Sequence, residues 1–333
     1  MADELYWIFG AALLLFVFYD FFYTTLSGSG AAILTRGVSL TAQGIIQFGV
    51  KIFGRKTYNL SAVLINCMML AVWVILIWIG LYLVFSSSPS AITDEANIPA
   101  SATERFYFIG YVISTLGIGD FKPSSGIFQI LTSCFSFLGF IFFTTSITYL
   151  ISISAAASHK RALALTINTL GHDPNLIAVC FSRMDKDLCA QHYLVLLEMI
   201  NKNTVNHQSY PVLHFYTSPD PSTSLSNNFT KLHEAVQILL SKKEQHSDSL
   251  RLLNRALDQF LKHLEDSYRI SKEGNKSIQD LTEILPSTYS VEQQDLNILS
   301  QEKRREILGG FLKSESYSWK DIFQDQERKH EEK

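Results

Sequence analysis

The segment TERFYFIGYVISTLGIGDFKP, residues 103–123, is too apolar for an ordinary exposed loop and too short to cross a bilayer twice. Its first part, residues 103–114, predicts a short helix, because Thr103 can cap the first turn and Glu104 suits the positive end of a helix. The letters TLGIGD at residues 115–120 follow, with two glycines separated by one residue. The segment therefore predicts a short helix that leads into a turn of unusual backbone geometry.

The turn at residues 115–120 has the composition of a cation site built from main-chain carbonyl groups. A partly dehydrated cation needs oxygen ligands in place of its water, and consecutive carbonyls supply them if they all point to one axis. That conformation requires left-handed backbone angles at alternate residues, which Gly117 and Gly119 adopt at little steric cost. Thr115 adds a hydroxyl oxygen at the inner end. Irregular backbone at membrane depth is tolerated only where it lines a cavity or is buried in protein.

Three apolar runs surround this segment, and each is long enough to cross a bilayer, which takes about 20 residues. They are residues 5–26, 60–85 and 126–153. The alternative is that they are buried helices of a soluble protein, but three such runs rarely occur in so short a soluble chain. The first run does not read as a signal peptide, because it begins with Asp3 and Glu4 instead of a basic region.

Charge divides the chain into two halves. Hydrophobic residues make up 47% of the chain and charged residues only 18%, whereas a soluble domain has about 25% charged residues. Nearly all of the shortage lies before residue 158, so the N-terminal half is predicted to be membrane-embedded and the C-terminal half soluble. The net charge of −3 gives no general attraction to nucleic acid. The four Cys form no disulfide framework and are predicted to be reduced thiols.

The distribution of charge in the loops predicts the orientation. The linker at residues 27–59 has four basic residues and no acidic one, and a basic cluster at residues 159–161 follows the third run, so both are assigned to the cytoplasm. The loop at residues 86–105 has three acids against one Arg and is assigned to the outside. The N-terminus is then outside and the C-terminal half inside, in the plasma or inner membrane. The four basic residues of the linker are Arg36, Lys51, Arg55 and Lys56.

An acid in the first run and the apolar residues of the following linker indicate how these segments contact the membrane. Asp20 lies within the run, and an acid inside a membrane invites a functional interpretation. We favour the alternative that Asp20 reaches the interface or bonds a neighbouring segment. The linker has apolar residues beside its basic ones, which favours a helix lying on the inner membrane surface. These apolar residues are Ile45, Ile46, Phe48, Val50, Ile52 and Phe53.

Residues 60–153 resemble the pore module of the potassium channel superfamily, whose usual filter pattern is T-V-G-Y-G-D. The resemblance rests on T-x-G-x-G-D at residues 115–120, on Pro123, on the pair Tyr107 and Phe108, and on Gly139, where many members have a hinge glycine. The module looks like that of simple bacterial channels with two helices per pore unit, here with an extra N-terminal crossing. The resemblance implies an outer helix at 60–85, a pore helix at 103–114, a filter at 115–120 and an inner helix at 126–153.

The resemblance also implies roles for particular residues. Oxygen atoms of Thr115, Leu116, Gly117, Ile118 and Gly119 would form the selectivity filter, with K+ at the first four of them. The residues expected to support the filter or line its outer mouth are Asp120, Lys122, Tyr107, Phe108 and Tyr111. The inner helix would line a cavity through Thr144, Thr145 and Thr148. Gly139 would either be a hinge or, like Ser136, a small residue that lets helices pack closely.

The segment departs from the usual filter pattern at three positions. Ile118 stands where the family has Tyr or Phe, whose side chain braces the filter; its loss would weaken selectivity for potassium over sodium. A poorly selective monovalent cation channel is therefore one alternative. Leu116 replaces Val or Ile, which is a mild change. Lys122 places a positive charge just outside the filter, and the Asp120 carboxylate would offset it.

Only one T-x-G-x-G-D occurs in the chain, and no repeat of the pore unit is visible. One chain would therefore supply a quarter of a ring, and the expected assembly is a homotetramer with the pore on its axis. Passive potassium flow needs no cofactor apart from the permeant ion. The sequence contains no nucleophile elbow, paired-carboxylate site or phosphate loop, so an enzyme is not expected. It also lacks the ladder of Arg residues of a voltage sensor.

Residues 154–333 are predicted to form a mostly helical cytoplasmic domain with a disordered tail at residues 324–333. The apolar runs at 175–181 and 212–216 could be strands or buried turns. One helix has a heptad-like stripe, for which packing within a helical domain is favoured over an axial coiled coil. The stripe consists of Leu250, Leu253, Leu257, Phe260 and Leu264.

A further helix is predicted to start at a capping box in Ser290–Gln293, to run through Leu308 and to end at Gly309 and Gly310. The cytoplasmic half lacks the Gly-rich turn of a nucleotide-binding gating domain, so no NAD, ATP or calcium gating is inferred. Its Cys and His residues do not have a common zinc spacing.

The cytoplasmic half could bind an unknown ligand or protein partner, or only steady the tetramer. An alternative from another class is a membrane-anchored sensor or scaffold whose pore is silent. The whole chain is predicted to be an all-α membrane protein with three transmembrane helices, a re-entrant pore helix and a selectivity filter, followed by the helical cytoplasmic domain.

Overall fold

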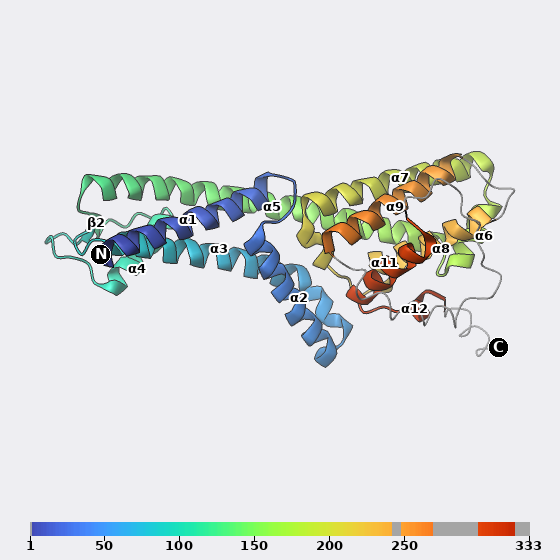
Figure 1. The fold of residues 1–333 in the computed structure, drawn as a ribbon, viewed down its shortest axis with the longest axis horizontal. Helices are drawn as coiled ribbons and strands as arrows, with labels where there is room; N and C mark the ends of the chain where they lie inside the picture. Colours follow the sequence, from blue (N-terminus) through green and yellow to red (C-terminus); the bar gives the residue numbers. More distant parts are fainter. Residues whose placement is uncertain (1, 242–247, 269–298, 324–333) are drawn as a thin grey trace. The chain divides into compact units, whose positions relative to one another are not determined.

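The computed structural model describes residues 2–241, 248–268 and 299–323 (Figure 1). The chain divides into two compact units. The first consists of Met1–Gly54, Leu60–Ser154 and Ser209–Phe215, and the second of Arg55–Asn59, Ala155–Gln208 and Tyr216–Lys333. Nearly all regular structure in the described part is helical, which confirms the all-α fold class.

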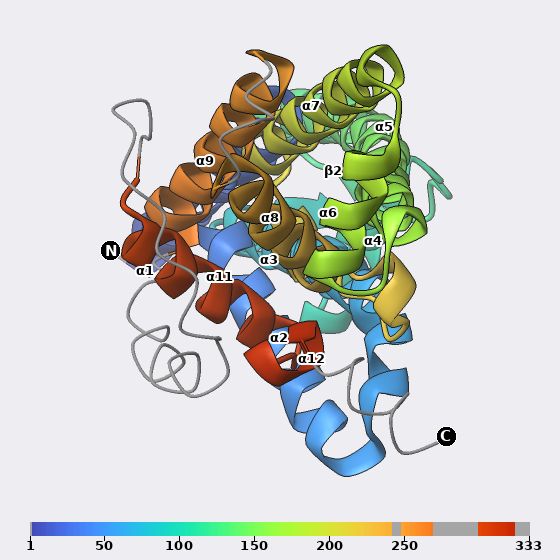
Figure 2. The ribbon, with the colours of Figure 1, turned by 90° about the vertical axis from the view of Figure 1, so that its right-hand side faces the viewer.

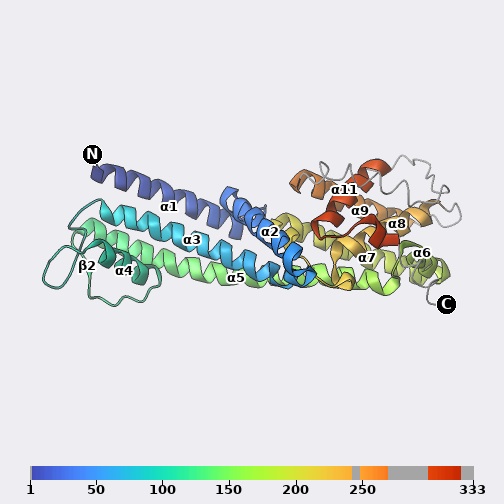
Figure 3. The same cartoon turned by 90° about the horizontal axis from the view of Figure 1, so that it is seen from below.

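Three long helices lie side by side in the first unit (Figures 1 and 3). They are α1 (Ala2–Leu26), α3 (Ser61–Ser86) and α5 (Gly126–Leu170), of which the part up to Ser154 belongs to this unit. Within the described ranges, these helices provide the three segments long and apolar enough to cross a membrane. The chain is therefore a membrane protein with three candidate crossings, and α5 continues without a break beyond the predicted inner helix.

Two glycines allow α1 and α3 to pack closely. A Cβ atom added at Gly10 would lie only 2.8 Å from the carbonyl oxygen of Gly80. Small residues permit such contacts between membrane helices, where van der Waals packing drives association. Nearer the other end of α1, the ring of Phe21 lies 5.0 Å from that of Trp73 on α3 and 4.5 Å from that of Phe142 on α5. These contacts join the three long helices.

Asp20 bonds a neighbouring segment, in line with the interpretation favoured from the sequence. One carboxylate oxygen accepts a hydrogen bond from the main-chain N–H of Leu34 at 2.8 Å. The other accepts from the Thr35 hydroxyl at 2.6 Å and from the Trp73 indole at 3.0 Å. Leu34 and Thr35 lie in the first turn of α2 (Ile33–Phe53), whose N–H groups lack partners within the helix. Asp20 therefore caps α2 and links it to α1 and α3.

Helix α4 (Ala102–Ile113), the predicted pore helix, is capped by Ser101 and not by Thr103. The Ser101 hydroxyl accepts a hydrogen bond from the main-chain N–H of Glu104, and the Glu104 carboxylate accepts one from the N–H of Ser101 at 2.7 Å. The predicted cap was wrong because the capping box places its Ser or Thr three residues before the Glu.

A two-stranded sheet, with one strand before α4 in the chain and one after it, was not predicted. Strand β1 (Ile92–Thr93) pairs antiparallel with β2 (Lys122–Pro123), with Ile92 opposite Pro123. Two-residue strands are too short to show an alternating sequence pattern. The pairing joins the loop after α3 to the segment that follows the predicted filter.

The second unit is a bundle of helices around α8 (Leu225–Ser241), every residue of which is buried from Leu225 through Leu239. Figure 2 shows α8 surrounded by the other helices of this unit. They are α6 (Pro174–Arg183), α7 (Lys186–Ser209), α9 (Asp248–Tyr268), α11 (Gln301–Ser314), α12 (Trp319–Phe323) and the last part of α5. This arrangement confirms the predicted helical C-terminal region.

The apolar stripe of α9 packs within the chain. All five of its predicted residues are fully buried and belong to one core with α8 and α11. The ring of Phe260 lies 4.9 Å from that of Phe229 on α8 and 6.0 Å from that of Phe311 on α11. The favoured interpretation, packing within a helical domain, is therefore confirmed over the axial coiled coil.

Other details differ from the predictions. The run at residues 175–181 lies in α6, and the run at 212–216 lies mostly in a short 3-10 helix, η2 (Pro211–Phe215), so neither is a strand. Helix α11 does not end at Gly309 and Gly310 but passes through both, and both are buried, so the helix packs closely against its neighbours at these positions. The predicted capping box at Ser290–Gln293 and the tail at residues 324–333 lie outside the described residues.

Candidate ion-conducting site

The predicted filter lies in the non-helical segment between α4 and α5. Helix α4 ends at Ile113, and Ser114 caps it. From there the backbone is left-handed at every second residue, with φ of 59° at Thr115, 57° at Gly117 and 88° at Gly119. An alternation of this kind allows successive carbonyl groups to point to the same side of the chain, as a ring of main-chain ligands requires.

Thr115 adopts a conformation that the sequence did not predict. A positive φ is easily accessible to Gly117 and Gly119 but is a genuine outlier for a β-branched residue. Such a conformation costs about 1–3 kcal/mol, and it persists only where the surrounding structure holds it. The position of Thr115 at the start of the turn is therefore maintained by its neighbours and not by its own preference.

Tyr111 on α4 holds the turn at both ends. Its carbonyl oxygen accepts hydrogen bonds from the main-chain N–H groups of Leu116 at 2.9 Å and Gly117 at 3.5 Å. Its hydroxyl donates to the main-chain carbonyl of Phe121 at 2.8 Å. One residue of the pore helix therefore fixes both the inner part of the turn and the point where the chain leaves it.

An aromatic cluster surrounds Tyr111. The rings of Tyr107 and Phe108 lie 5.3 Å and 5.1 Å from that of Tyr111. Phe121, which the sequence analysis did not single out, contributes a fourth ring, 6.4 Å from that of Tyr107. The predicted support residues of the pore helix are thus brought together. The side chains of Leu116 and Ile118, in contrast, are 68% and 52% exposed in the single chain.

Asp120 and Lys122 follow the turn and carry opposite charges. One carboxylate oxygen of Asp120 accepts a hydrogen bond from the main-chain N–H of Phe121 at 3.1 Å. Lys122 lies in β2 with its side chain exposed. The strand pairing of Lys122 with Thr93 fixes the backbone beyond the turn. The arrangement therefore places one acid and one base in the segment that leaves the predicted filter.

Arg105 was missed by the sequence analysis as a residue that positions the pore helix. Its guanidinium is buried and donates hydrogen bonds to the main-chain carbonyls of Phe85 at 3.0 Å and Ser88 at 3.1 Å, and also to that of Pro89. Its Nε donates to the carbonyl of Ala100 at 3.0 Å. Arg105 therefore fastens α4 to the end of α3. The available signal was a lone Arg in an otherwise acidic loop.

Gly139 lies where α5 crosses the end of the pore helix. A Cβ atom at this position would lie 2.2 Å from the carbonyl oxygen of Ile113, a distance that real Cβ atoms do not reach. Helix α5 runs unbroken through Gly139. Of the two interpretations, this contact supports close packing.

The candidate cavity-lining residues lie further along α5. The side chains of Thr144 and Thr148 are exposed, and Thr145 is half-buried. The hydroxyl of Thr144 donates to the carbonyl of Phe140, and that of Thr148 to the carbonyl of Thr144. Thr144 and Thr148 are four residues apart and therefore share one face of the helix.

Comparisons with known proteins identify the family of the chain. Residues 68–155 match the family described as Ion channel. Over 330 residues the chain is 30% identical to the "Uncharacterized membrane protein YdjJ" of Bacillus subtilis (strain 168), with 95% of this chain and 96% of the relative covered. No solved structure matches significantly.

The chain belongs to the ion channel family of the potassium channel superfamily that has two membrane helices per pore unit. It is therefore a channel-type membrane protein.

Proposed function

We propose that the protein is a homotetrameric channel that conducts K+ passively and selectively through main-chain oxygen atoms of residues 115–119. K+ would be held at the levels of Thr115, Leu116, Gly117 and Ile118. The observation that carries the proposal is the left-handed backbone at Thr115, Gly117 and Gly119. The function requires no cofactor other than the permeant ion.

The number of pore loops supports four subunits. Each chain supplies one such turn, and a closed ring of carbonyl ligands in this superfamily is formed by four of them. Cyclic assembly would bring the four turns to one axis and the exposed side chains of Leu116 and Ile118 against neighbouring protein. The face of α5 that carries Thr144 and Thr148 would then line the cavity on the inner side of the filter.

A weakly selective cation channel is the second candidate, and Ile118 favours it. In the single chain the side chain of Ile118 is 52% exposed, and it has no hydroxyl group to bond a neighbouring element. One hydroxyl that braces the turn is that of Tyr111, which donates to the carbonyl of Phe121. If that brace is too weak, the carbonyl ring adapts to Na+ as well.

We further propose that the protein spans the plasma or inner membrane with its N-terminus outside and its C-terminal part in the cytoplasm. Helix α2 would then lie on the inner surface. Its buried side faces α1 and α3 through Thr35, Val38 and Ala42, and its outer side exposes large apolar residues beside Arg36 and Lys51. Such a face suits the boundary between acyl chains and anionic headgroups. The exposed apolar residues are Ile33, Leu40, Ile45, Phe48, Ile52 and Phe53.

Flux from purified protein in liposomes tests the function. The proposal predicts barium-sensitive K+ flux that is lost in Gly117→Ala, because a methyl group is strained at a φ of 57°. Gly126→Ala is the matched control, since a Cβ there meets nothing within 4 Å. Reversal potentials in mixed K+ and Na+ separate the two candidates. Absence of flux of either ion from correctly folded protein would contradict both.

A further inference from the structure

The three residues that follow α11, Glu315, Ser316 and Tyr317, form a turn that is held by several distant parts of the second unit. The N–H of Tyr317 bonds the carbonyl of Leu312 at 2.9 Å, and the N–H of Ser316 bonds that of Lys313 at 3.0 Å. These bonds end the helix in a Schellman motif, whose left-handed position is normally a glycine. Here Ser316 occupies it with a φ of 58°.

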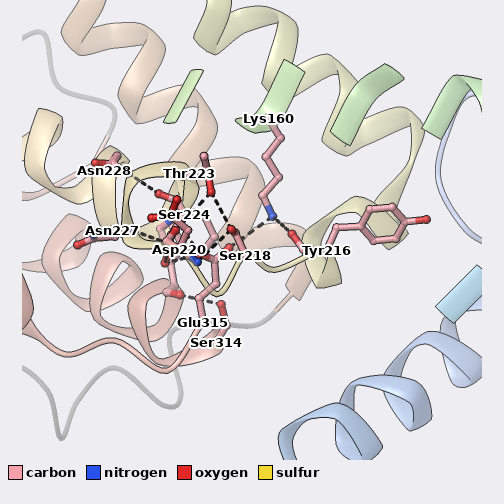
Figure 4. A network of polar contacts seen from close by, with 12 residues as sticks. Lys160, Tyr216, Ser218, Asp220, Thr223, Ser224, Asn227, Asn228, Ser314 and Glu315 are labelled. Atoms are coloured by element: carbon pink, nitrogen blue, oxygen red, sulfur yellow. Dashed lines mark hydrogen bonds and ion pairs between the residues drawn. The ribbon is translucent and has the colours of Figure 1, made fainter. Parts of the chain in front are cut away.

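The Glu315 carboxylate occupies the N-terminus of α8 (Figure 4). One oxygen accepts hydrogen bonds from the hydroxyl of Ser224 at 2.5 Å and from that of Ser226 at 2.8 Å. It also lies 3.4 Å from the main-chain N–H of Ser226. A carboxylate at this position interacts favourably with the positive end of the helix. The side chain of Glu315 is fully buried, so these contacts take the place of water.

Lys160 on α5 carries the positive charge that pairs with the Glu315 carboxylate. Its ammonium group lies 3.4 Å from the second oxygen of Glu315 and donates a hydrogen bond to the carbonyl of Tyr216 at 2.8 Å (Figure 4). The side chains of Lys160 and Glu315 are only 4% and 1% exposed. Removing one partner of a buried pair leaves an uncompensated charge, so the two groups act together. The pair therefore fastens the last part of α5 to the turn.

The segment that precedes α3 holds the same turn from another side. A short 3-10 helix, η1 (Arg55–Leu60), leads directly into α3. The Arg55 guanidinium donates to the main-chain carbonyl of Ser316 at 2.8 Å and lies 3.9 Å from the ring centroid of Tyr317. The hydroxyl of Tyr58 lies 2.6 Å from that of Ser316. The side chain that strains the turn is thus the one that contacts η1.

We propose that the turn at residues 315–317 is the regulatory junction through which the second unit controls the pore. It binds the continuations of both long helices that flank the pore loop, α3 through η1 and α5 through Lys160. A buried ion pair and a strained serine are retained where a glycine and apolar residues would be more stable. This combination suits an element with an attached and a released state. The inference rests on the proposed channel function.

The test uses two mild substitutions in the full-length protein. Ser316→Gly relieves the backbone strain and removes the hydroxyl, so this variant is expected to fold at least as well as the wild type. Tyr58→Phe removes the other hydroxyl of the same contact. Each is expected to change the open probability of single channels several-fold, with the K+ to Na+ permeability ratio unchanged. The double variant should resemble each single one, because both lose one interaction.

Glu315→Gln and Lys160→Met test the ion pair in the same way. Lys303→Met is the matched control, because Lys303 forms a half-exposed pair with Glu265 at 2.8 Å within the same unit and contacts neither η1 nor α5 in the bonds described. The control is expected to leave open probability unchanged. Wild-type gating in all four junction variants, or independent effects of Ser316→Gly and Tyr58→Phe, would overturn the proposal.

A second readout does not depend on ion flow. In a background whose native cysteines are replaced, Thr148→Cys provides a thiol on the exposed face of α5. Its rate of modification by a water-soluble reagent is expected to change several-fold in Ser316→Gly and not in Lys303→Met. If the wild-type protein conducts no ions, the proposed function fails, while this rate still decides the junction. An unchanged rate would contradict the junction even in a conducting protein.

Discussion

The hydroxyl of Tyr111 donates a hydrogen bond to the main-chain carbonyl of Phe121 at 2.8 Å. Because the carbonyl of Tyr111 also accepts from the N–H of Leu116, the same residue spans the turn at residues 115–120. In the potassium channel superfamily an aromatic residue of the filter itself serves as a brace, and Ile118 cannot donate such a bond. In the proposed channel, Tyr111 of α4 would supply this brace in place of a filter residue.

Tyr111→Phe tests this brace. Loss of one hydrogen bond of about 1 kcal/mol should make the carbonyl ring less rigid and lower the permeability ratio of K+ to Na+ several-fold. Reversal potentials in mixed solutions measure the ratio. Tyr82→Phe, a change on α3 outside the turn, is the control and should leave it unchanged. An unaltered ratio in Tyr111→Phe would show that the hydroxyl does not support selectivity.

Lys122→Gln tests the charge at the outer mouth. Lys122 is exposed and follows Asp120 by two residues, so in the proposed channel its ammonium group would oppose the approach of cations. Inward K+ current is expected to rise in the variant at low ionic strength and to approach that of the wild type at high salt, where exposed charges are screened. Current that does not change at low ionic strength, with normal surface expression, would argue against an exposed ring of Lys122.

Gly139→Ala distinguishes packing from hinge motion. The added methyl group would lie 2.2 Å from the Ile113 carbonyl oxygen, so we expect a loss of about 1–3 kcal/mol in stability through overpacking. Thermal unfolding of the purified protein measures it, with Gly126→Ala as the control on the same helix. A variant of normal stability whose gating alone is altered would favour the hinge.

Asp20→Asn tests whether the intramembrane acid is structural. Its amide nitrogen cannot accept the hydrogen bonds that the carboxylate receives from α2 and Trp73, so stability should fall by about 1–3 kcal/mol. Ion selectivity should not change. Asp3→Asn, an exposed position on the same helix, is the control. Altered selectivity with unaltered stability would show that Asp20 takes part in permeation.

The lowered pKa of Glu234 predicts how the stability of the second unit depends on pH. Burial raises the pKa of its carboxyl, but the hydrogen bond and charge of His233 and the guanidinium of Arg305 outweigh burial and lower the pKa to about 2. A lowered pKa stabilises the fold above the ordinary value of 4.5, and this contribution is lost as the pH falls through the folded value. The loss amounts to about 3 kcal/mol.

Unfolding of the purified protein between pH 5 and pH 2, roughly the window set by linkage, measures this effect. Glu234→Gln should flatten the pH dependence, whereas Glu265→Gln, which removes a half-exposed partner of Lys303, should change it little. Equal slopes in the wild type and Glu234→Gln would contradict the assignment.

The sequence predicted structure best where a single physical requirement determines the residue types of a continuous segment. Membrane helices need long apolar runs, and the pore turn needs closely spaced glycines, so both could be predicted from local residue types. The backbone conformation of Thr115 could not be predicted, because a positive φ opposes the preference of a β-branched residue and is imposed by neighbouring structure.

Contacts between residues that are far apart in the chain also could not be predicted from local sequence patterns. Lys160 and Glu315 are far apart in the chain, and no spacing rule connects them. In the sequence Arg105 is a single charge in a loop, and only the structure shows that it donates hydrogen bonds to main-chain carbonyls. Gly309 and Gly310 are typical of a helix end, yet the helix continues through both, and the left-handed position falls at Ser316, whose hydroxyl contacts that of Tyr58. Tertiary contacts decided each of these cases.

The most direct test of the central claim is a density map of the purified full-length protein in a K+-containing solution. Our account predicts four subunits around one axis, with the carbonyls of residues 115–119 directed toward it and ion density between them. A turn that faces lipid or lies away from the axis, or an assembly with any other number of subunits, would contradict it.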